Sequence, residues 1–208
     1  MKNKIIAVIG AGGKTTLIHR LAEEYRRKGA SVLVSTTTHM LVEPDTDLSC
    51  DSFAIMENIK KTGYCMAGAV CPENSTKMQS LPEQMLHDLM KQVDYALIEA
   101  DGAKHYALKY PLEQEPVIPE GTTDVILVLG SWDLGKPCKD VVFRFEHMAC
   151  VLGISGNVKA DKQILQLIQR AYEEKLKNMD YQGRFHVLLS EKTDRGLMFH
   201  ALEEWLYE

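Results

Sequence analysis

The sequence predicts an α/β fold, in which helices cover both faces of a mostly parallel sheet. Three observations lead to this prediction. Short apolar runs, typical of buried parallel strands, alternate with amphipathic helical patterns along the chain. Polar, glycine-containing segments follow two of these runs, at the strand ends where such sheets bind ligands. The 208 residues, 45% hydrophobic and 25% charged, suit a single domain spanning residues 1–208.

The first elements are a strand, a helix and a second strand. Lys4–Ile9 is a short apolar run that ends at a glycine, which suits a buried strand. From Lys14 to Lys28 the apolar residues return at helical spacing, and Gly29 is placed to close the helix. Ser31–Thr36 (SVLVST) follows as the next strand. This order is the usual beginning of a parallel sheet.

The middle of the chain carries weaker patterns. Residues from about 37 to 81 are rich in polar residues and predict an irregular insert, with short strands near Ser52–Met56 and Tyr64–Val70. Pro82–Lys91 predicts a helix with proline in its first turn. Tyr95–Ile98 is a third apolar strand, and acidic residues follow it directly.

The second half begins with a proline-containing extended loop, Lys104–Gly121, before another buried strand, Asp124–Leu129. Lys162–Met179 has one apolar helical face. Phe185–Leu189 predicts a late strand. Leu197–Leu206 predicts a closing amphipathic helix, for which Thr193 or Asp194 would serve as N-cap.

The segment GAGGKTTL, which begins at Gly10, has the composition of a phosphate-binding loop. The standard pattern G-x-x-x-x-G-K-[ST] would put its first glycine at position 8, where this chain has Val8. Between a strand and a helix, backbone N–H groups can converge on a phosphate. Lys14 would reach the β- and γ-phosphates, and the Thr15 hydroxyl would bind Mg²⁺. The predicted nucleotide-binding residues are Gly10, Ala11, Gly12, Gly13, Lys14, Thr15 and Thr16.

The alternative is a tight turn whose lysine is simply solvated. The position at a strand-to-helix junction favours nucleotide binding, of ATP or GTP. The loop also resembles the x-G-T-N-G-K-T-T loop of Mur-type ligases. It is more loosely similar to the K-G-G-V-G-K-T-T loop of MinD-type ATPases, whose signature lysine is Ile9 here. These resemblances imply a three-layer fold like that of the P-loop NTPases.

Two carboxylates follow the third strand in the segment YALIEADG. Glu99 and Asp101 alternate along an extended chain, so both side chains should point to the same side. An apolar strand that ends in a carboxylate is the shape of a Walker B segment, which holds Mg²⁺. We expect Thr15 and Asp101 to bind the metal and Glu99 to orient a water as a base. Solvated acids at a strand end are the alternative.

Weaker candidates lie elsewhere. Thr37, in the segment STTTHM after the second strand, could contact a γ-phosphate. Lys104, Lys109 and Arg144 are candidate anion contacts, although a solvated charge is the commoner role for each taken singly.

Several functional classes fit the sequence poorly. The net charge of −5 argues against recruitment by nucleic acid. No apolar run reaches the length of a membrane span, and the apolar run at residues 5–9 is too short for a signal segment. We therefore expect a cytoplasmic protein with no membrane partner. The five cysteines form no C-x-x-C pair and are expected to be reduced thiols.

Taken together, these segments resemble the YqeC family. The matching text is GAGGKTTL, then STTTHM where the family usually has T-T-T-K-M, then EADGAK with LKYP and EPVIP. The resemblance is firm from about Ile5 to Gly130 and weaker in a divergent C-terminal third from about residue 131. There, FRFE stands where family members tend to have H-R-P-E. The site residues implied by the resemblance are Gly12, Gly13, Lys14, Thr15, Thr37, Glu99, Asp101 and Lys104.

The resemblance also implies a pathway: accessory work in selenium cofactor biosynthesis and in the maturation of selenium-dependent molybdenum hydroxylases, with a protein of that pathway as partner. The leading hypothesis is a Mg²⁺-dependent nucleoside triphosphate-binding protein that hydrolyses ATP or GTP slowly. An ATP-dependent ligase or transferase is the second hypothesis, suggested by the Mur-like loop. The third is a non-catalytic binding module that nucleotide regulates.

Overall fold

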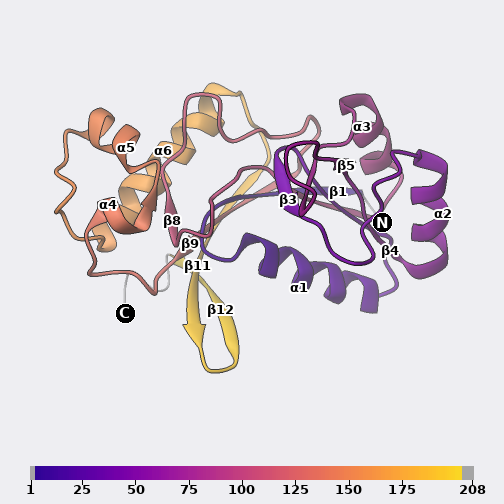
Figure 1. Cartoon of the computed structure of the whole chain (residues 1–208), viewed down its shortest axis with the longest axis horizontal. Helices are drawn as coiled ribbons and strands as arrows, with labels where there is room; N and C mark the ends of the chain where they lie inside the picture. The colour runs from indigo at the N-terminus through magenta and orange to yellow at the C-terminus, as the bar shows by residue number, and fades with distance from the viewer. Residues whose placement is uncertain (1–2, 203–208) are drawn as a thin grey trace. The chain divides into compact units, whose positions relative to one another are not determined.

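The computed structural model describes residues 3–202, and the chain divides into two compact units (Figure 1). The first unit comprises the segment that ends at Val8, Thr15–Gly102 and Val117–Val125. The second comprises Ile9–Lys14, Ala103–Pro116 and the described chain from Ile126 onward. Each unit thus draws on separate stretches of sequence. The single domain expected from the sequence stays a prediction.

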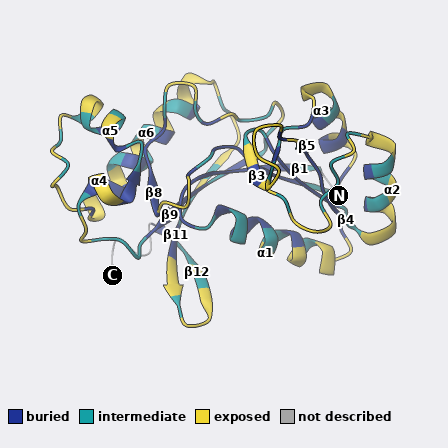
Figure 2. Ribbon diagram, in the orientation of Figure 1, coloured by how far each residue is buried: buried dark blue, intermediate teal, exposed yellow. Residues whose placement is uncertain are grey.

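The first unit is built on four parallel strands. Their order is β1 (Lys4–Gly10), β7 (Tyr95–Glu99), β2 (Val32–Thr36) and β4 (Tyr64–Met66). The pairs β1–β7, β7–β2 and β2–β4 are all parallel, and the register sets Val8 of β1 opposite Glu99 of β7. The expected mostly parallel sheet is confirmed. Burial explains the apolar runs, since β1, β7 and β2 are almost entirely enclosed (Figure 2).

Helices cover both faces of this sheet. On one face, Tyr25 of α1 (Lys14–Arg27) stacks on Tyr95, with ring centroids 3.7 Å apart. Consecutive residues of a strand point to opposite faces. Ala96 therefore faces away from α1, and it joins a buried cluster with α2 (Ser52–Thr62) and α3 (Glu83–Lys91). The cluster members from these helices are Ile55, Ile59, Leu86, Leu89 and Met90. The α/β fold with helices on both faces is therefore confirmed.

The insert at 37–81 is more regular than the sequence suggested. The strand predicted near Ser52–Met56 is wrong, because this stretch forms α2. The Asp51 side chain accepts hydrogen bonds from the N–H groups of Phe53 and Ala54 and so caps the helix. The strand predicted at Tyr64–Val70 is confirmed in part, as β4 and β5 (Ala69–Val70).

A small antiparallel sheet lies in the same insert. Its order is β3 (His39–Leu41), β6 (Lys77–Gln79) and β5, and both pairings are antiparallel. The insert therefore contributes a helix, a strand of the main sheet and a second sheet to the first unit.

The second unit contains β9 (Asp124–Gly130) from Ile126 onward, with β11 (Arg184–Thr193) and β12 (Gly196–Ala201) in the order β12-β11-β9. β11 and β12 form an antiparallel hairpin. The helix predicted at Leu197–Leu206 is therefore wrong over residues 197–201, and its last four residues, 203–206, lie outside the described part of the chain.

The cause of this error is local. Apolar residues at 197, 199 and 201 alternate as in a half-buried strand, and the Thr193 hydroxyl donates to the Gly196 carbonyl across a tight turn. Neither Thr193 nor Asp194 caps a helix. The remaining elements are β8 (Leu108–Lys109) and β10 (Val142–Phe143), which pair in parallel, with α4 (Cys138–Val141), α5 (Phe145–Leu152) and α6 (Lys162–Asn178).

α6 confirms its prediction almost to the residue, because Asp161 caps it and its apolar face is buried. Across the described residues, no helix combines the length and the apolar character that a bilayer crossing requires.

Candidate functional site

The glycine-rich loop is a short connection between a strand and a helix. β1 runs to Gly10 and α1 begins at Lys14, so only residues 11–13 lie between them. Val8, at the position of the first glycine in longer loops, is a fully buried strand residue opposite Glu99. A glycine is not needed there, because the chain is still in the sheet. The segment is thus a shortened phosphate loop in shape.

Glycine is required at two loop positions by conformation and by space. Gly10 and Gly12 both have φ of +86°, which side chains rarely adopt. A Cβ on Gly10 would lie 2.4 Å from the Val128 oxygen, and one on Gly12 would lie 2.6 Å from the Gly130 nitrogen. Both contacts are with backbone atoms of β9, which cannot rotate away. The loop therefore packs directly on β9 within the second unit.

The loop offers N–H groups to a ligand. The Ala11 N–H donates to the Val128 oxygen at 2.9 Å, which anchors the loop. In residues 3–202, no protein acceptor is recorded for the N–H groups of Gly12 and Gly13. The first turn of α1 adds further N–H groups without intrahelical partners, beside the positive end of the helix dipole. This cradle fits a phosphate group.

Lys14 lies over the loop that precedes it. Its side chain is 5% exposed, and its Nζ donates a hydrogen bond to the Gly10 oxygen at 2.8 Å. The lysine folds back along its own loop, which is the position from which an ammonium group can reach phosphates held by the loop amides.

The C-terminal third supports the loop, and the sequence did not reveal this. The buried Ser190 hydroxyl of β11 donates to the Gly12 carbonyl. Leu197 of β12 also lies against the loop, because a Cβ on Gly13 would lie 2.5 Å from its Cδ1. The signal available in the sequence was a serine that continues an apolar strand, but such residues are too common to single out.

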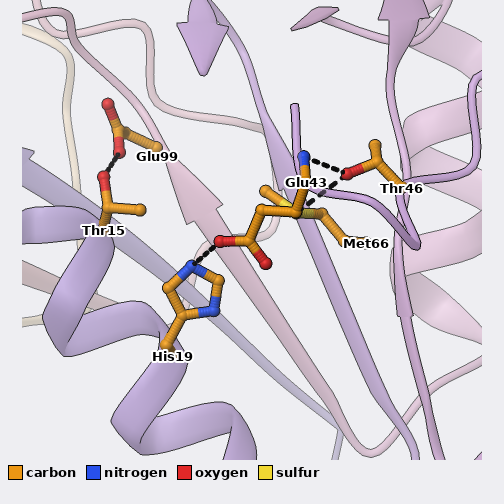
Figure 3. A network of polar contacts seen from close by, with 6 residues as sticks. All are labelled: Thr15, His19, Glu43, Thr46, Met66 and Glu99. Carbon is orange, nitrogen blue, oxygen red and sulfur yellow. Dashed lines mark hydrogen bonds and ion pairs between the residues drawn. The ribbon is translucent and has the colours of Figure 1, made fainter. Parts of the chain in front are cut away.

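Thr15 and Glu99 meet in the first unit. The Thr15 hydroxyl donates to the Glu99 carboxylate, with 3.0 Å between Oγ1 and Oε2 (Figure 3). Glu99 is 7% exposed and belongs to β7, on the same face as Tyr95. Thr16 follows on α1 and is half-buried. The residue expected to bind the metal, Thr15, is therefore in direct contact with the residue expected to orient a water, Glu99.

The same helix carries a second contact one turn further on. His19 Nε2 lies 2.8 Å from the Glu43 carboxylate, and both residues belong to the first unit (Figure 3). This contact joins α1 to the start of the insert, and nothing in the sequence pattern indicated it.

Asp101 is fully buried, in the same unit as Glu99. A hydroxyl and carboxylates are the oxygen ligands that Mg²⁺ uses, together with phosphate oxygens and waters. Within residues 3–202, no group of three or more His, Cys, Asp and Glu residues could hold a metal by itself. The residues present therefore fit a metal that nucleotide phosphates help to bind, rather than a metal enclosed by protein ligands alone.

Two threonines at the end of β2 and just after it bind the end of β7. The buried Thr36 hydroxyl donates to the Glu99 carbonyl at 2.8 Å, and the Thr37 N–H donates to the same carbonyl at 3.1 Å. The Thr37 hydroxyl donates to the Val117 carbonyl at 2.7 Å. These contacts fix the backbone that carries Glu99, and a phosphate contact by Thr37 stays a prediction.

Lys104 lies in the second unit, whereas Glu99 and Asp101 lie in the first. Its side chain is exposed, and its Nζ lies 5.7 Å from the ring centroid of Phe143. Its proposed part in nucleotide binding stays a prediction.

The five cysteines are free thiols, and burial raises the pKa of Cys65 to about 11. Such a thiol is inert near neutral pH.

Comparison with known proteins places the chain in a family. The profile of the family described as "YqeC protein" matches residues 6–146, and that range contains the loop and both carboxylates. This chain belongs to the YqeC family. The protein "Uncharacterized protein YqeC" of Escherichia coli (strain K12) is 32% identical to it over 183 residues, covering 84% of this chain and 71% of the relative.

Among solved structures, the YqeC chain is similar to FtsY from Mycoplasma mycoides, with 16% sequence identity and a TM-score of 0.39. The match covers 98% of this chain and 65% of the FtsY chain, so the YqeC chain spans about two thirds of the length of that structure. A likeness of this size says nothing about activity.

Proposed function

We propose that this YqeC-family protein binds a nucleoside triphosphate together with Mg²⁺ at residues 10–16 and hydrolyses it slowly. The observation that carries the proposal is the loop itself. Gly12 and Gly13 present N–H groups with no recorded protein acceptor, at the N-terminus of a helix that begins with Lys14. An anion is the ligand for which such a loop is built.

The chain's own groups divide the work as follows. Lys14 and the loop amides neutralise phosphate charge, and positioning and electrostatics make up most of phosphoryl-transfer catalysis. Thr15 and Asp101 would hold Mg²⁺, and a bound Mg²⁺ would supply further positive charge beside the phosphates. Glu99 then orients the attacking water. The Thr15 hydroxyl, which now donates to Glu99, would turn one of its lone pairs to the metal.

The pathway part of the proposal rests on the family alone. We propose that nucleotide binding serves the maturation of selenium-dependent molybdenum hydroxylases and that a protein of that pathway is the partner. ATP and GTP are equal candidates, because no sequence motif identifies the residues that would contact the nucleotide base.

A ligase or transferase is the second candidate function. The observation that favours it is a group of cationic side chains around Phe143, in the same unit as the loop, where an anionic acceptor would fit. A ligase turns over only with an acceptor present, whereas a hydrolase turns over slowly alone. The non-catalytic module predicts tight binding with no turnover in either case.

The decisive experiment is calorimetric titration of the full chain with ATP and with GTP, with and without Mg²⁺. We expect one nucleotide to bind in a Mg²⁺-dependent way and Lys14→Ala to weaken that binding by roughly 10- to 100-fold, the usual worth of a hydrogen bond to a charged group. Lys28→Ala is the matched control, because Lys28 is exposed just beyond the other end of the same helix.

Equal affinities in the wild type and the Lys14→Ala variant would remove the loop from the proposal. Absence of binding by either nucleotide would leave GAGGKTTL as a turn, or as a site for another anion.

A further inference from the structure

Three cationic side chains surround one aromatic ring in the second unit. Lys104 Nζ lies 5.7 Å from the centroid of Phe143, Lys109 Nζ lies 5.8 Å from it, and Arg144 Cζ lies 4.6 Å from it. All three distances fall within the range of cation–π attraction, about 6 Å. We call these four residues the Phe143 cluster.

Separate stretches of chain bring the cluster together. β8 and β10 pair in parallel, with Lys109 opposite Phe143, and the Tyr110 N–H donates to the Phe143 carbonyl at 3.0 Å. Arg144 has φ of +68°, so the chain turns sharply between β10 and α5. Lys104 also has a positive φ, of +44°. Such conformations cost energy in residues other than glycine, and here two of the three cations adopt them.

The cluster carries surplus positive charge. The fully buried Lys109 has an acidic partner, with its Nζ 3.0 Å from the Glu115 carboxylate. Among the residues that the structure describes, no acid forms an ion pair with Lys104 or Arg144. The cations at this ring repel each other, and a bound oxyanion would offset that repulsion because it attracts each of them.

Arg144 shows where such an oxyanion would bind. Its Nε is buried and has no hydrogen-bond partner among residues 3–202, although the side chain as a whole is only half-buried. A buried donor of a charged group that lacks an acceptor is costly. Guanidinium groups also recognise phosphate and carboxylate through paired donors. Nε of Arg144 and the exposed ammonium of Lys104 are therefore the candidate donors for an oxyanion.

The cluster adjoins the phosphate loop through Ala107, which lies between Lys104 and Lys109 in the chain. The Ala107 carbonyl accepts from the Gly130 N–H at 2.8 Å, and it lies 2.7 Å from the position that a Cβ on Gly12 would take. One short segment therefore carries two cluster lysines and touches the loop, all within the second unit.

We propose that the Phe143 cluster binds the phosphate group of a second ligand, a phosphate monoester, beside the phosphate loop. Phosphate is favoured over a monocarboxylate because two cations without acidic partners match its two negative charges. The geometry of the cluster alone supports anion binding. A role for the cluster as the binding site of an acceptor substrate rests on the function proposed above.

The test is nuclear magnetic resonance of the arginine Nε–H groups, in the full chain carrying Lys14→Ala so that the loop is silenced. Inorganic phosphate is titrated in at constant ionic strength, with chloride as the balancing anion and Arg144→Lys to assign the signal. We expect the Arg144 Nε–H signal to shift and to saturate. Succinate is titrated in parallel, and a stronger response to succinate would overturn the assignment to phosphate.

Affinity is then measured by calorimetry in the same background. Lys104→Gln and Arg144→Gln are each expected to weaken phosphate binding by roughly 10- to 100-fold. Lys139→Gln, a change of an exposed lysine of the same unit, is the control and should have no effect. If Arg144→Gln does not fold, Lys104→Gln still decides, because the Lys104 side chain is exposed.

A static Arg144 signal, or equal phosphate affinities in the Lys104 and Lys139 variants, would overturn the proposal. Failure of nucleotide binding with an intact Arg144 response would instead remove only the function proposed above, so the two failures are distinguishable.

Discussion

The phosphate loop and the Phe143 cluster both present positive potential, but they are built from different parts of the chain. In the loop, backbone N–H groups would bind the ligand. Glycines stand at positions 10 and 12, where the surrounding structure leaves no room for a Cβ. In the cluster, long side chains from two segments, residues 104–109 and 143–144, converge on one ring. The residues of a backbone site are consecutive, so such a site can be recognised in the sequence. A side-chain site is assembled from distant residues and can be recognised only in the folded structure.

The difference also predicts how each region responds to substitution. Because the loop packs directly on β9, the addition of one methyl group should severely disrupt the conformation of the loop. A cluster of flexible cations should lose affinity by steps, one side chain at a time.

The largest expected effect is that of Gly12→Ala. Its φ of +86° is unfavourable for alanine by about 1–2 kcal/mol. In addition, the new methyl group would meet backbone atoms 2.6–2.7 Å away. We expect nucleotide binding to fall by more than about 100-fold, since the loop amides must move, and the melting temperature to drop. Calorimetry and thermal unfolding measure the two effects.

Gly29→Ala is the control for that prediction. Gly29 has φ of +81°, but nothing lies within 4 Å of its potential Cβ. It should show the conformational cost without the clash, a loss of about 1 kcal/mol with nucleotide affinity unchanged. Equal stability losses in the two variants would show that the loop is not packed as described.

Ser190→Ala tests the support beneath the loop. It removes the hydroxyl that donates to the Gly12 carbonyl and leaves a buried acceptor without that donor. We expect a loss of about 1–3 kcal/mol in the free energy of unfolding by urea, and nucleotide binding several-fold weaker. Ser155→Ala, at an exposed position of the same unit, should change neither quantity.

Phe143→Leu tests the cluster by its ring rather than by its charges. Each cation–π contact is worth about 0.5–1 kcal/mol at exposed sites, so the loss of one such contact should lower phosphate affinity in the Lys14→Ala background by roughly two- to fivefold. An unchanged affinity would mean that the cations act without the ring, and that the ring serves packing alone.

The smallest expected effect comes from a polar contact with no part in either region. Asp94 accepts hydrogen bonds from the Ser31 N–H at 2.9 Å and from the Ser31 hydroxyl at 2.8 Å. These bonds lower the pKa of Asp94 below its usual 3.8. Its stabilising effect is therefore present above about pH 4 and disappears as the pH falls through the lowered value.

Asp94→Asn should accordingly cost about 0.5–1 kcal/mol in urea unfolding at pH 7, and this cost should shrink as the pH falls through the lowered pKa of Asp94. A cost that stayed constant as the pH was lowered would assign the effect to packing rather than to the carboxylate. This contact sets the scale of a purely structural interaction, against which the effects in the loop and the cluster can be judged.

Much of the first unit could be predicted from the sequence. β1, α1, β2 and β7 have strong apolar patterns, Gly10 ends β1 and Gly29 follows α1, so the local sequence was sufficient to predict these elements. The segment at Ser52 was mistaken for a strand because Phe53–Met56 is a short continuous apolar run, and the helix depends on a cap at Asp51. β12 was mistaken for a helix because a short apolar pattern fits both periods, and pairing with β11 decides between them.

The candidate site, like the fold, could be predicted from the sequence only in part. Thr15 was expected to bind a metal and Glu99 to orient a water, and the two side chains are in contact. Their separate chemical roles stay predictions. The contributions of Ser190 and Phe143 could not be predicted, because they depend on strand pairings and on a left-handed residue, Arg144, that no local pattern announces.

The hydrogen bond from the Ser190 hydroxyl to the Gly12 carbonyl has a practical consequence for the design of truncated proteins of this family and for their comparison. The family profile ends at residue 146, and a fragment designed to that limit would retain every recognisable motif. It would nonetheless lack Ser190, so the Gly12 carbonyl would lose its donor, and Leu197 would no longer lie against Gly13. Two proteins can therefore share all the signature residues and still differ in whether the loop keeps its shape.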